Sequence, residues 1–210
     1  MAQSENEKTS PPRPTRAERS EQTLNALLDA AAEVVGELGY QDASVARITL
    51  SAGVAQGTFY NYFNSRQDLF DELLPRMGRE MLAYIQDNVD MSASGAERER
   101  QRFTAYLHYL RENPGFYRVL YQAETLAPQA HRDHIGNVVS GYVRSLKRGW
   151  DRGEMPMYDA EEIEAIAYIL TAIRDYFSMR YGREMCDEAV TRKAIDTYTK
   201  VIMHGVFSGN

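Results

Sequence analysis

The sequence predicts an all-α protein, with a small N-terminal helix-turn-helix head of three helices and a larger helical body. Three observations support this fold class. Apolar residues recur at steps of three and four along most of the chain, no segment alternates apolar and polar residues as a strand does, and glycine or proline separates the periodic segments. No stretch is repeated. The chain therefore reads as a series of helices joined by short turns.

Length and composition narrow the class of protein. The chain has 210 residues, of which 43% are hydrophobic, enough for a sizeable core. Its net charge of −6 argues against general coating of nucleic acid but is compatible with a local basic surface. A single cysteine, Cys186, excludes an intrachain disulfide. With no signal-peptide pattern and no apolar run of about 20 residues, we expect a soluble cytoplasmic protein.

Residues 1–18 are expected to form a disordered arm, because they are polar, rich in proline and poor in residues that can be buried. The arm and its border carry four basic residues, Lys8, Arg13, Arg16 and Arg19. Two interpretations remain open. The arm is a solvated tail, or it follows a DNA groove or backbone through Arg16 and Arg19.

The first helix is predicted over residues 21–38, where seven apolar residues share one face, and Gly39 ends it. These apolar residues are Leu24, Leu27, Leu28, Ala31, Val34, Val35 and Leu38. The helix would support the segment that follows and give it a core.

Residues 44–63 are predicted to form two short helices around a tight turn. Ser44 is placed to cap the first helix, and Gly53 supplies a residue that tolerates positive φ in the turn. The second helix, residues 56–62, is rich in hydrogen-bonding and aromatic side chains and poor in aliphatic ones. This composition suits a helix that lies in the major groove of DNA, with its partner helix crossing behind it.

This segment resembles the helix-turn-helix of the TetR-type bacterial transcriptional regulators. The matching residues are Val45, Ile48, Ala52-Gly53-Val54, Gly57-Thr58-Phe59-Tyr60, Tyr62-Phe63 and Asp68-Leu69-Phe70. The sequence departs from the family pattern at Ala55, where Ser or Thr is usual, at Gln56, where a basic residue is common, and at Thr49, which replaces a small Ala. The resemblance implies a homodimeric DNA-binding regulator, here a repressor, that binds a palindromic operator and is released by a small-molecule inducer.

The chemistry of the side chains divides the candidate DNA contacts into two groups. Gln56, Thr58 and Asn61 are expected to read base edges, because Gln and Asn can pair with adenine and Thr can meet a thymine methyl group. Phosphate contacts are expected from Ser44, Arg47, Tyr60, Tyr62 and Arg66. Phe59 and Phe63 are expected in the small core of the head, which we delimit as residues 19–64.

The body, residues 65–210, begins with a helix predicted to extend to about residue 89. Ser65 and Asp68 have the spacing of a capping box. Pro75 lies inside this helix and is expected to kink it. In the resembling family this helix connects head and body, so Pro75 is interpreted either as a hinge or as a harmless bend.

Three further helices are predicted over residues 96–112, 116–126 and 129–151, and they are unusually rich in aromatic rings. Many tyrosine hydroxyls are difficult to satisfy in a sealed core, so a cavity for a mainly apolar ligand is one interpretation and a plain aromatic core is the other. The resemblance favours an inducer site here. The candidate ligand contacts are Met81, Tyr84, Tyr106, His108, Tyr117, Tyr121, Glu124, Tyr142 and Arg174.

A stripe of basic residues on the last of these helices consists of Arg144, Lys147, Arg148 and Arg152. It is interpreted as a solvated face, with an anion site for the phosphates of an acyl-coenzyme A as the alternative.

Residues 161–180 and 189–207 are predicted to be two helices that form a dimer interface, because apolar residues in the first recur with the spacing of a packing seam. The predicted interface residues are Ile163, Ile166, Leu170, Ile173, Phe177, Tyr198 and Ile202. The alternative is that both helices only complete the core of the monomer.

Other classes of function have weaker support in the sequence. His131 and His134 share a helix face with Asp133 nearby, but further metal ligands are not apparent. The sequence has no Gly-rich phosphate loop, no serine nucleophile motif and no paired-cysteine motif. We expect no enzyme activity, cofactor or metal, and keep a helical-bundle enzyme or a metal-dependent sensor as the alternative.

Overall fold

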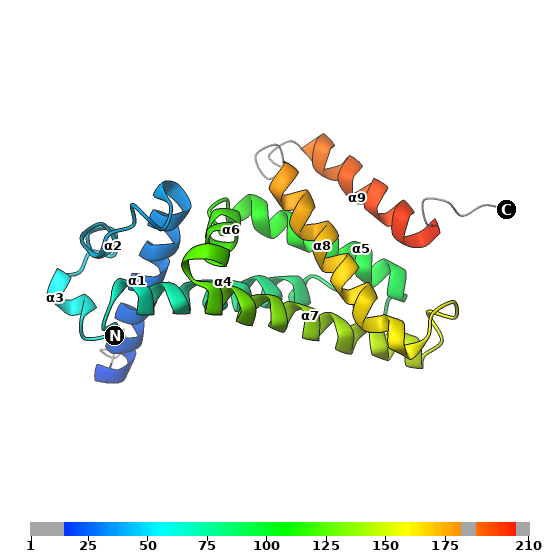
Figure 1. The fold of residues 1–210 in the computed structure, drawn as a ribbon, viewed down its shortest axis with the longest axis horizontal. Coiled ribbons are helices and arrows are strands. Elements are labelled where there is room, and N and C mark those ends of the chain that lie inside the picture. Colours follow the sequence, from blue (N-terminus) through cyan, green and yellow to red (C-terminus); the bar gives the residue numbers. More distant parts are fainter. Residues whose placement is uncertain (1–14, 182–187, 205–210) are drawn as a thin grey trace, which may run out of the picture.

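A computed structural model describes residues 15–181 and 188–204. Within these ranges it contains α-helices and one short 3-10 helix and no strand, so the predicted all-α fold is confirmed. The head, at one end of the elongated molecule, consists of α1 to α3, and the body consists of α4 to α9 (Figure 1). No helix in these ranges is long and apolar enough to cross a membrane.

Helix α1 spans Arg16–Leu38 and begins five residues earlier than predicted. Thr15 caps it in a reciprocal arrangement, because the Thr15 hydroxyl accepts from the Glu18 N–H at 3.2 Å and the Glu18 carboxylate accepts from the Thr15 N–H at 2.6 Å. Arg16 and Arg19 therefore lie in the first turn of α1, and their assignment to a disordered arm was wrong. Lys8 and Arg13 lie outside the described residues.

The helix-turn-helix consists of α2, Val45–Ser51, and α3, Gln56–Phe59. Gly53 lies in the turn with φ of 67°, as its position predicts. Helix α3 is shorter than expected, because after Phe59 the chain continues as turns that bring Phe63 beside Phe59, with ring centroids 5.4 Å apart. Both rings are buried, in agreement with their predicted place in the core of the head.

Thr49 is buried where α2 packs, yet its hydroxyl group is satisfied. It donates to the Val45 carbonyl at 2.9 Å, one helical turn earlier. This local hydrogen bond explains how a threonine occupies a position where the resembling family has alanine.

Helix α4, Arg66–Asp87, leads from the head into the body and packs along α7, Pro128–Asp151 (Figure 1). The predicted cap is present, since the Asp68 N–H donates to the Ser65 hydroxyl at 3.1 Å. Pro75 lies inside α4, as predicted.

The remaining helices of the body agree with the predicted segments to within a few residues over the described ranges. They are α5, Gly95–Glu112; α6, Phe116–Leu126; α8, Ile163–Tyr181, preceded by the 3-10 helix Ala160–Glu162; and α9, Glu188–His204. Helix α8 packs against α7, and α9 packs against α5. The final predicted turn of α9, residues 205–207, lies outside the described residues.

The head also contacts the body directly, through α1 and α6. A β-carbon on Gly36 would lie 2.7 Å from the Cα of Gly115, so the two helices cross with their backbones in contact. Beside this crossing, Arg118 donates to the carbonyls of Gly36 and Glu37, and Gln122 accepts from the Tyr40 N–H at 3.0 Å. The head is thus attached to the body at the start of α4, at this crossing, and where Arg76 of α4 pairs with Asp29 of α1 at 2.6 Å.

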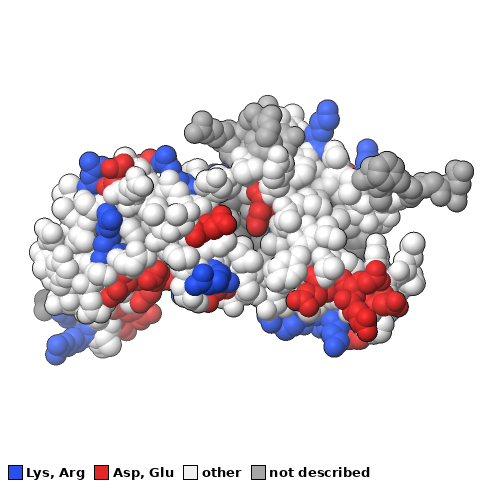
Figure 2. Space-filling model, viewed as in Figure 1, with Lys and Arg blue, Asp and Glu red and all other residues white. Residues whose placement is uncertain are grey.

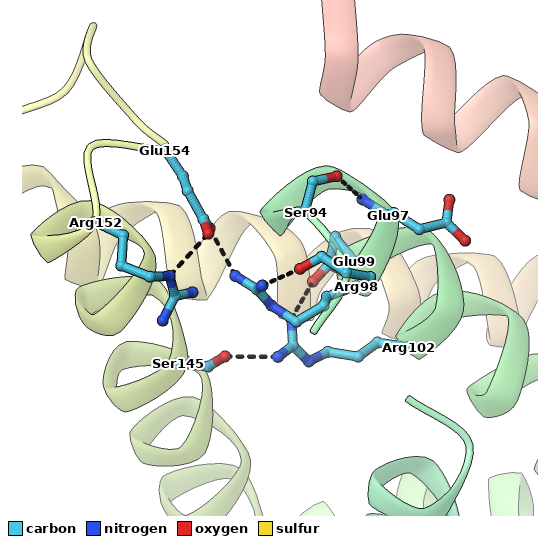
Figure 3. Close-up of polar contacts among 9 residues, drawn as sticks. Ser94, Glu97, Arg98, Glu99, Arg102, Ser145, Arg152 and Glu154 are labelled. Atoms are coloured by element: carbon cyan, nitrogen blue, oxygen red, sulfur yellow. Dashed lines mark hydrogen bonds and ion pairs between the residues drawn. The ribbon is translucent and has the colours of Figure 1, made fainter. Parts of the chain in front are cut away.

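An ion pair between a buried arginine and a more exposed glutamate closes the opposite end of the body. Arg98 in α5 is 4% exposed, and its Nη2 lies 2.6 Å from Oε2 of Glu154, in the segment after α7. Figure 3 shows Glu154 also reaching Arg152. The pair fixes the segment after α7 to the start of α5.

Candidate functional site

The helix-turn-helix presents polar side chains on its outer surface. Gln56, Tyr60 and Asn61 are exposed, and Thr58 is half-buried. Gly57 lies among them with open space where a side chain would be. Because Phe59 fills the core of the head, the opposite face of α3 is available to an external partner.

Two of the expected phosphate-contact residues already have hydrogen bonds within the head. The Ser44 hydroxyl caps α2 by accepting from the Arg47 N–H at 3.3 Å. The Tyr62 hydroxyl accepts from the Ser20 hydroxyl of α1 at 3.3 Å. The Arg47 side chain is exposed beside them.

Arg66 has a structural role that the sequence did not reveal. Its Nη1 donates to the Gln41 carbonyl at 3.2 Å, and its guanidinium carbon lies 5.4 Å from the centroid of the Phe70 ring. Arg66 thereby holds the loop between α1 and α2 against the start of α4. A phosphate contact at Arg66 stays a prediction, alongside this role.

The centre of the body contains a buried cluster of charged and phenolic side chains. The guanidinium carbon of Arg174 in α8 lies 4.6 Å from the ring centroid of Tyr142 in α7 and 5.0 Å from that of Tyr106 in α5. Tyr142 and Tyr198 both donate to Oε1 of Glu99, at 3.0 and 2.6 Å. Three expected ligand residues, Tyr106, Tyr142 and Arg174, therefore meet here.

The other expected ligand residues do not all join this cluster. Met81 is buried, and Tyr84 packs against Tyr109 with ring centroids 5.6 Å apart. His108 and Tyr117 are half-buried. Tyr121 is 60% exposed and Glu124 is also exposed, so neither belongs to the buried cluster, and their contact with a ligand stays a prediction. They lie on the outer side of α6, which the pattern of rings could not distinguish from its inner side.

Residues 27–73 match the family model for bacterial regulatory proteins of the tetR family. This match covers α2, α3 and their packing partners, with the polar side chains described above on its outer surface. The head therefore contains a helix-turn-helix of the tetR type.

Curated relatives are similar to this chain over part of its length. It is 32% identical over 72 residues to a fatty acid metabolism regulator protein of Bacillus subtilis, which covers 34% of this chain and 37% of that protein. It is 32% identical over 111 residues to the HTH-type transcriptional repressor KstR2 of Mycobacterium tuberculosis, covering 52% and 55%. The chain thus spans between about a third and a half of the length of these relatives.

The fold of the whole chain is similar to solved structures. One is the transcriptional regulator FadR from Bacillus subtilis in complex with stearoyl-CoA, with a TM-score of 0.74, 18% identity and coverage of 87% of this chain and 98% of that one. This likeness concerns the fold of head and body together.

His134 in α7 is a buried residue whose importance the sequence did not indicate. Its ring lies 6.0 Å from that of Phe116, and a β-carbon on Gly78 of α4 would lie 2.2 Å from its Nδ1. Burial, with the positive charges of His131 and Arg174, lowers the pKa of His134 to about 4, so its imidazole is neutral at pH 7. His134 thus contacts the helix that enters the body from the head. No group of three His, Cys, Asp or Glu side chains in the described part of the chain is placed to hold a metal ion.

The expected dimer residues of this chain face its own core. Ile163, Leu170 and Tyr198 are buried, and Ile166, Ile173, Phe177 and Ile202 are partly buried against the same core. Their place in a dimer interface stays a prediction, and the structure shows that these residues pack in the core of the monomer. The exposed apolar face of α8 is a different one, and it consists of Tyr168, Ile169, Tyr176 and Met179.

Charged residues occur in both parts of the chain. On the face shown in Figure 2, Lys and Arg side chains lie at the head end and again on the body, and several of them lie beside Asp or Glu. The basic stripe predicted from the sequence, Arg144, Lys147, Arg148 and Arg152, is exposed along the end of α7. Arg152 pairs with Glu154 at 2.8 Å.

Proposed function

We propose that this protein is a ligand-responsive transcriptional regulator that binds a palindromic operator as a homodimer in the cytoplasm and has no enzymatic activity. The observation that carries the proposal is the outward display of Gln56, Tyr60 and Asn61 by a helix-turn-helix of the TetR type. A helix of this kind reads bases in the major groove through a few exposed side chains. Repression rather than activation is supported by the relative named as a transcriptional repressor.

Base and phosphate contacts are assigned to different residues of the head. Gln56, Thr58 and Asn61 read base edges, because their side chains lie on the outer surface and offer amide or hydroxyl groups. Arg47, Tyr60, Tyr62, Ser44 and Arg66 position the head on the phosphates. Of these, Arg47 is the clearest candidate, because its side chain is exposed.

The body is proposed to bind a mainly apolar small molecule that releases the protein from DNA. The aromatic and charged cluster around Arg174 supports this site, and one solved structure of similar fold contains stearoyl-CoA. Release requires that the ligand bind more tightly to a conformation whose two heads no longer fit successive major grooves. Helix α4 and the crossing of α1 with α6 connect such a change to the heads.

The proposed dimer interface is the exposed apolar face of α8, residues Tyr168, Ile169, Tyr176 and Met179. Their positions recur at helical steps on one side of the helix, opposite the side that packs on α7. A palindromic operator presents two equivalent half-sites, so a two-fold symmetric contact between α8 helices would supply two heads.

The proposal is tested by fluorescence anisotropy on inverted repeats upstream of the gene and its neighbour. We expect tight binding to one such repeat. Gln56→Ala should weaken binding to it by about 1–3 kcal/mol and relax the preference at one base position. Arg47→Ala should weaken binding to all DNA and reduce its salt dependence.

The two variants serve as controls for each other, since both change exposed residues of the head. Identical effects on base preference and salt dependence would remove the division into base-reading and phosphate-binding residues. Failure of the wild-type protein to bind any of these repeats would contradict the proposed function itself.

A further inference from the structure

Arg174 is a buried cation without a counterion among the residues that the structure describes. Its side chain is 3% exposed, no described carboxylate oxygen lies within 4 Å of it, and its Nε has no hydrogen-bond partner. Its contacts are the rings of Tyr106 and Tyr142. Buried charges are normally paired, because removing a charge from water is costly. An arginine in this state therefore indicates a missing anion.

Another arginine of this protein is buried to the same degree but has an ion pair and hydrogen bonds. Arg98 is 4% exposed, pairs with Glu154 at 2.6 Å and also donates to the Ala93 carbonyl (Figure 3). The lack of a partner at Arg174 is thus a local property of the Arg174 site and not a general feature of the fold.

Glu99, an acidic residue of the same cluster, interacts with other groups. Its Oε1 accepts from Tyr142 and Tyr198, and its Oε2 lies 3.5 Å from Nη1 of Arg102. Arg102 also donates to Ser145 at 2.6 Å (Figure 3). Asp175, the other carboxylate that acts on Arg174, does not contact its guanidinium group within 4 Å, so Arg174 has no direct anionic partner among the described residues.

A second buried donor lies beside Arg174. Tyr106 is almost fully buried, and its hydroxyl has no hydrogen-bond partner in the described residues. Burial, reinforced by Asp175, raises the pKa of Tyr106 to about 12. Ser178 lies close enough to offset part of this rise in the pKa, but it forms no hydrogen bond with the Tyr106 hydroxyl. Tyr106 therefore keeps its proton at pH 7 and can donate it to an acceptor.

We propose that Arg174 and Tyr106 bind the carboxylate of an apolar acid, so that the ligand of the body is a free acid rather than a thioester or a neutral molecule. This inference rests on the proposed function. A carboxylate supplies both the missing negative charge and acceptors that match a guanidinium group and a hydroxyl. The carbonyl of a thioester or ester offers an acceptor but leaves the buried charge uncompensated. Other buried rings of the same core, Phe103, Tyr109 and Phe116, suit an apolar tail.

The site is closed in this structure, which has a consequence for regulation. Clefts on the described surface lie elsewhere, one along Glu188, Arg192 and Asp196 of α9 and another at Pro75 and Asn137. An acid that reaches Arg174 must therefore stabilise a more open arrangement of α5, α7 and α8. Such a ligand shifts the conformational equilibrium, as a ligand-responsive regulator requires.

The proposal is tested by calorimetric titration of the purified dimer with octanoic, dodecanoic, hexadecanoic and 3-phenylpropanoic acids. Each acid is compared with its methyl ester and its coenzyme A thioester. We expect at least one acid to bind at least about tenfold more tightly than its ester and thioester, the loss expected for a charge-assisted hydrogen bond. Arg174→Met should remove this preference, and Arg111→Met, which changes an exposed arginine of α5, should keep it.

A second measurement does not depend on the identity of the acid. Without ligand, Arg174→Met should unfold at the same or a higher temperature than the wild type, because an apolar side chain replaces an uncompensated charge. Arg98→Met, at the paired arginine, should lower the unfolding temperature by several degrees, since it breaks the ion pair of a buried arginine. A large loss of thermal stability in Arg174→Met would instead make Arg174 a structural residue and overturn the proposal.

The titration has three results that would also overturn the proposal. They are no binding of any acid of the series, equal binding of acid and ester, and unchanged binding of the acid by Arg174→Met. If the thioester bound more tightly than the acid, and Arg148→Met weakened that binding, the ligand site would instead be the basic stripe on α7, and the proposal would be overturned. Operator binding measured in parallel separates this inference from the proposed function, because a protein that binds its operator but fails these tests loses only the carboxylate site.

Discussion

The imidazole of His134 in α7 lies directly against the backbone of Gly78 in α4. A β-carbon on Gly78 would lie 2.2 Å from Nδ1 and 2.7 Å from Cε1 of that ring. His134 is buried and packs against Phe116, so its ring has little room to move away. The contact joins the helix that comes from the head to the helix that borders Arg174.

Gly78→Ala is therefore expected to lower the free energy of unfolding by about 1–3 kcal/mol, because the methyl group would overpack the contact between α4 and α7. Gly136→Ala is the matched control, since Gly136 also lies in a helix but has nothing within 4 Å of the added carbon. It should gain up to about 1 kcal/mol from helix propensity. Urea unfolding of both variants measures the difference. Equal free energies of unfolding for Gly78→Ala and Gly136→Ala would show that α7 shifts at little cost to make room for the added methyl group.

The buried imidazole of His134 should make the stability of the protein depend on pH. Its pKa is about 4 in the folded protein, against about 6.5 in an unfolded chain, so the unfolded state binds more protons between these values. Stability from the neutral ring is complete above about pH 6.5 and is lost as the pH falls toward 4. The loss between pH 7.5 and 5 is expected to be about 2 kcal/mol.

This contribution is measured by urea unfolding of the wild type and of His134→Gln at both pH values. The variant should lose less stability between them, because glutamine does not titrate. His108→Gln, in α5, controls for the general effect of removing a histidine. A wild type and a His134→Gln variant with parallel pH dependence would contradict the buried neutral ring.

The two arginines that contact Glu154 should differ in their importance for stability. Arg98 is buried, whereas the side chain of Arg152 is 49% exposed. Arg98→Ala is expected to cost about 1–3 kcal/mol, because it removes the charge-assisted hydrogen bonds of a buried guanidinium group to Glu154 and to the Ala93 carbonyl. Arg152→Ala should cost less than about 1 kcal/mol, because solvent screens an exposed pair. Similar costs in thermal or urea unfolding would show that the burial of Arg98 adds nothing.

The proposed dimer surface is tested by a charge on the exposed face of α8. Tyr176→Asp should produce monomers in sedimentation velocity and weaken operator binding, while circular dichroism keeps its helical signal. Tyr121→Asp is a matched control, because Tyr121 of α6 has a similar exposed fraction, 60% against 64% for Tyr176. Dimers that persist in Tyr176→Asp would place the interface on another surface.

Local signals in the sequence predicted the elements well, and the contacts between elements less well. The bounds of α6 agree with the predicted 116–126, and the Ser65 cap is present, because both depend on neighbouring residues. The early start of α1 was missed although Thr15 and Glu18 have the spacing of a capping box. The prolines just before Thr15 led us to extend the arm too far along the chain.

The body shows why periodicity has limits. Helix α8 is apolar on both sides, with Ile166 and Leu170 on one side and Tyr168 and Ile169 on another. A pattern of this kind cannot tell which side packs inside the monomer and which side is left for a second copy. Arg174 was predicted as a ligand residue, but its lack of a counterion among the described residues depends on α5, α7 and α8 meeting in space, which spacing along the chain does not encode.

The crossing of Gly36 with Gly115 limits how far the head can be treated as an exchangeable module. A head grafted from a related regulator would meet this body through the same crossing, and any side chain larger than hydrogen at position 36 would push α1 off α6. Such a chimera would still fold and bind the donor's operator through its own α3. It would respond to this body's ligand only if the graft kept glycine at position 36 opposite Gly115. New sensors built from this scaffold therefore need donor heads with a glycine at this position.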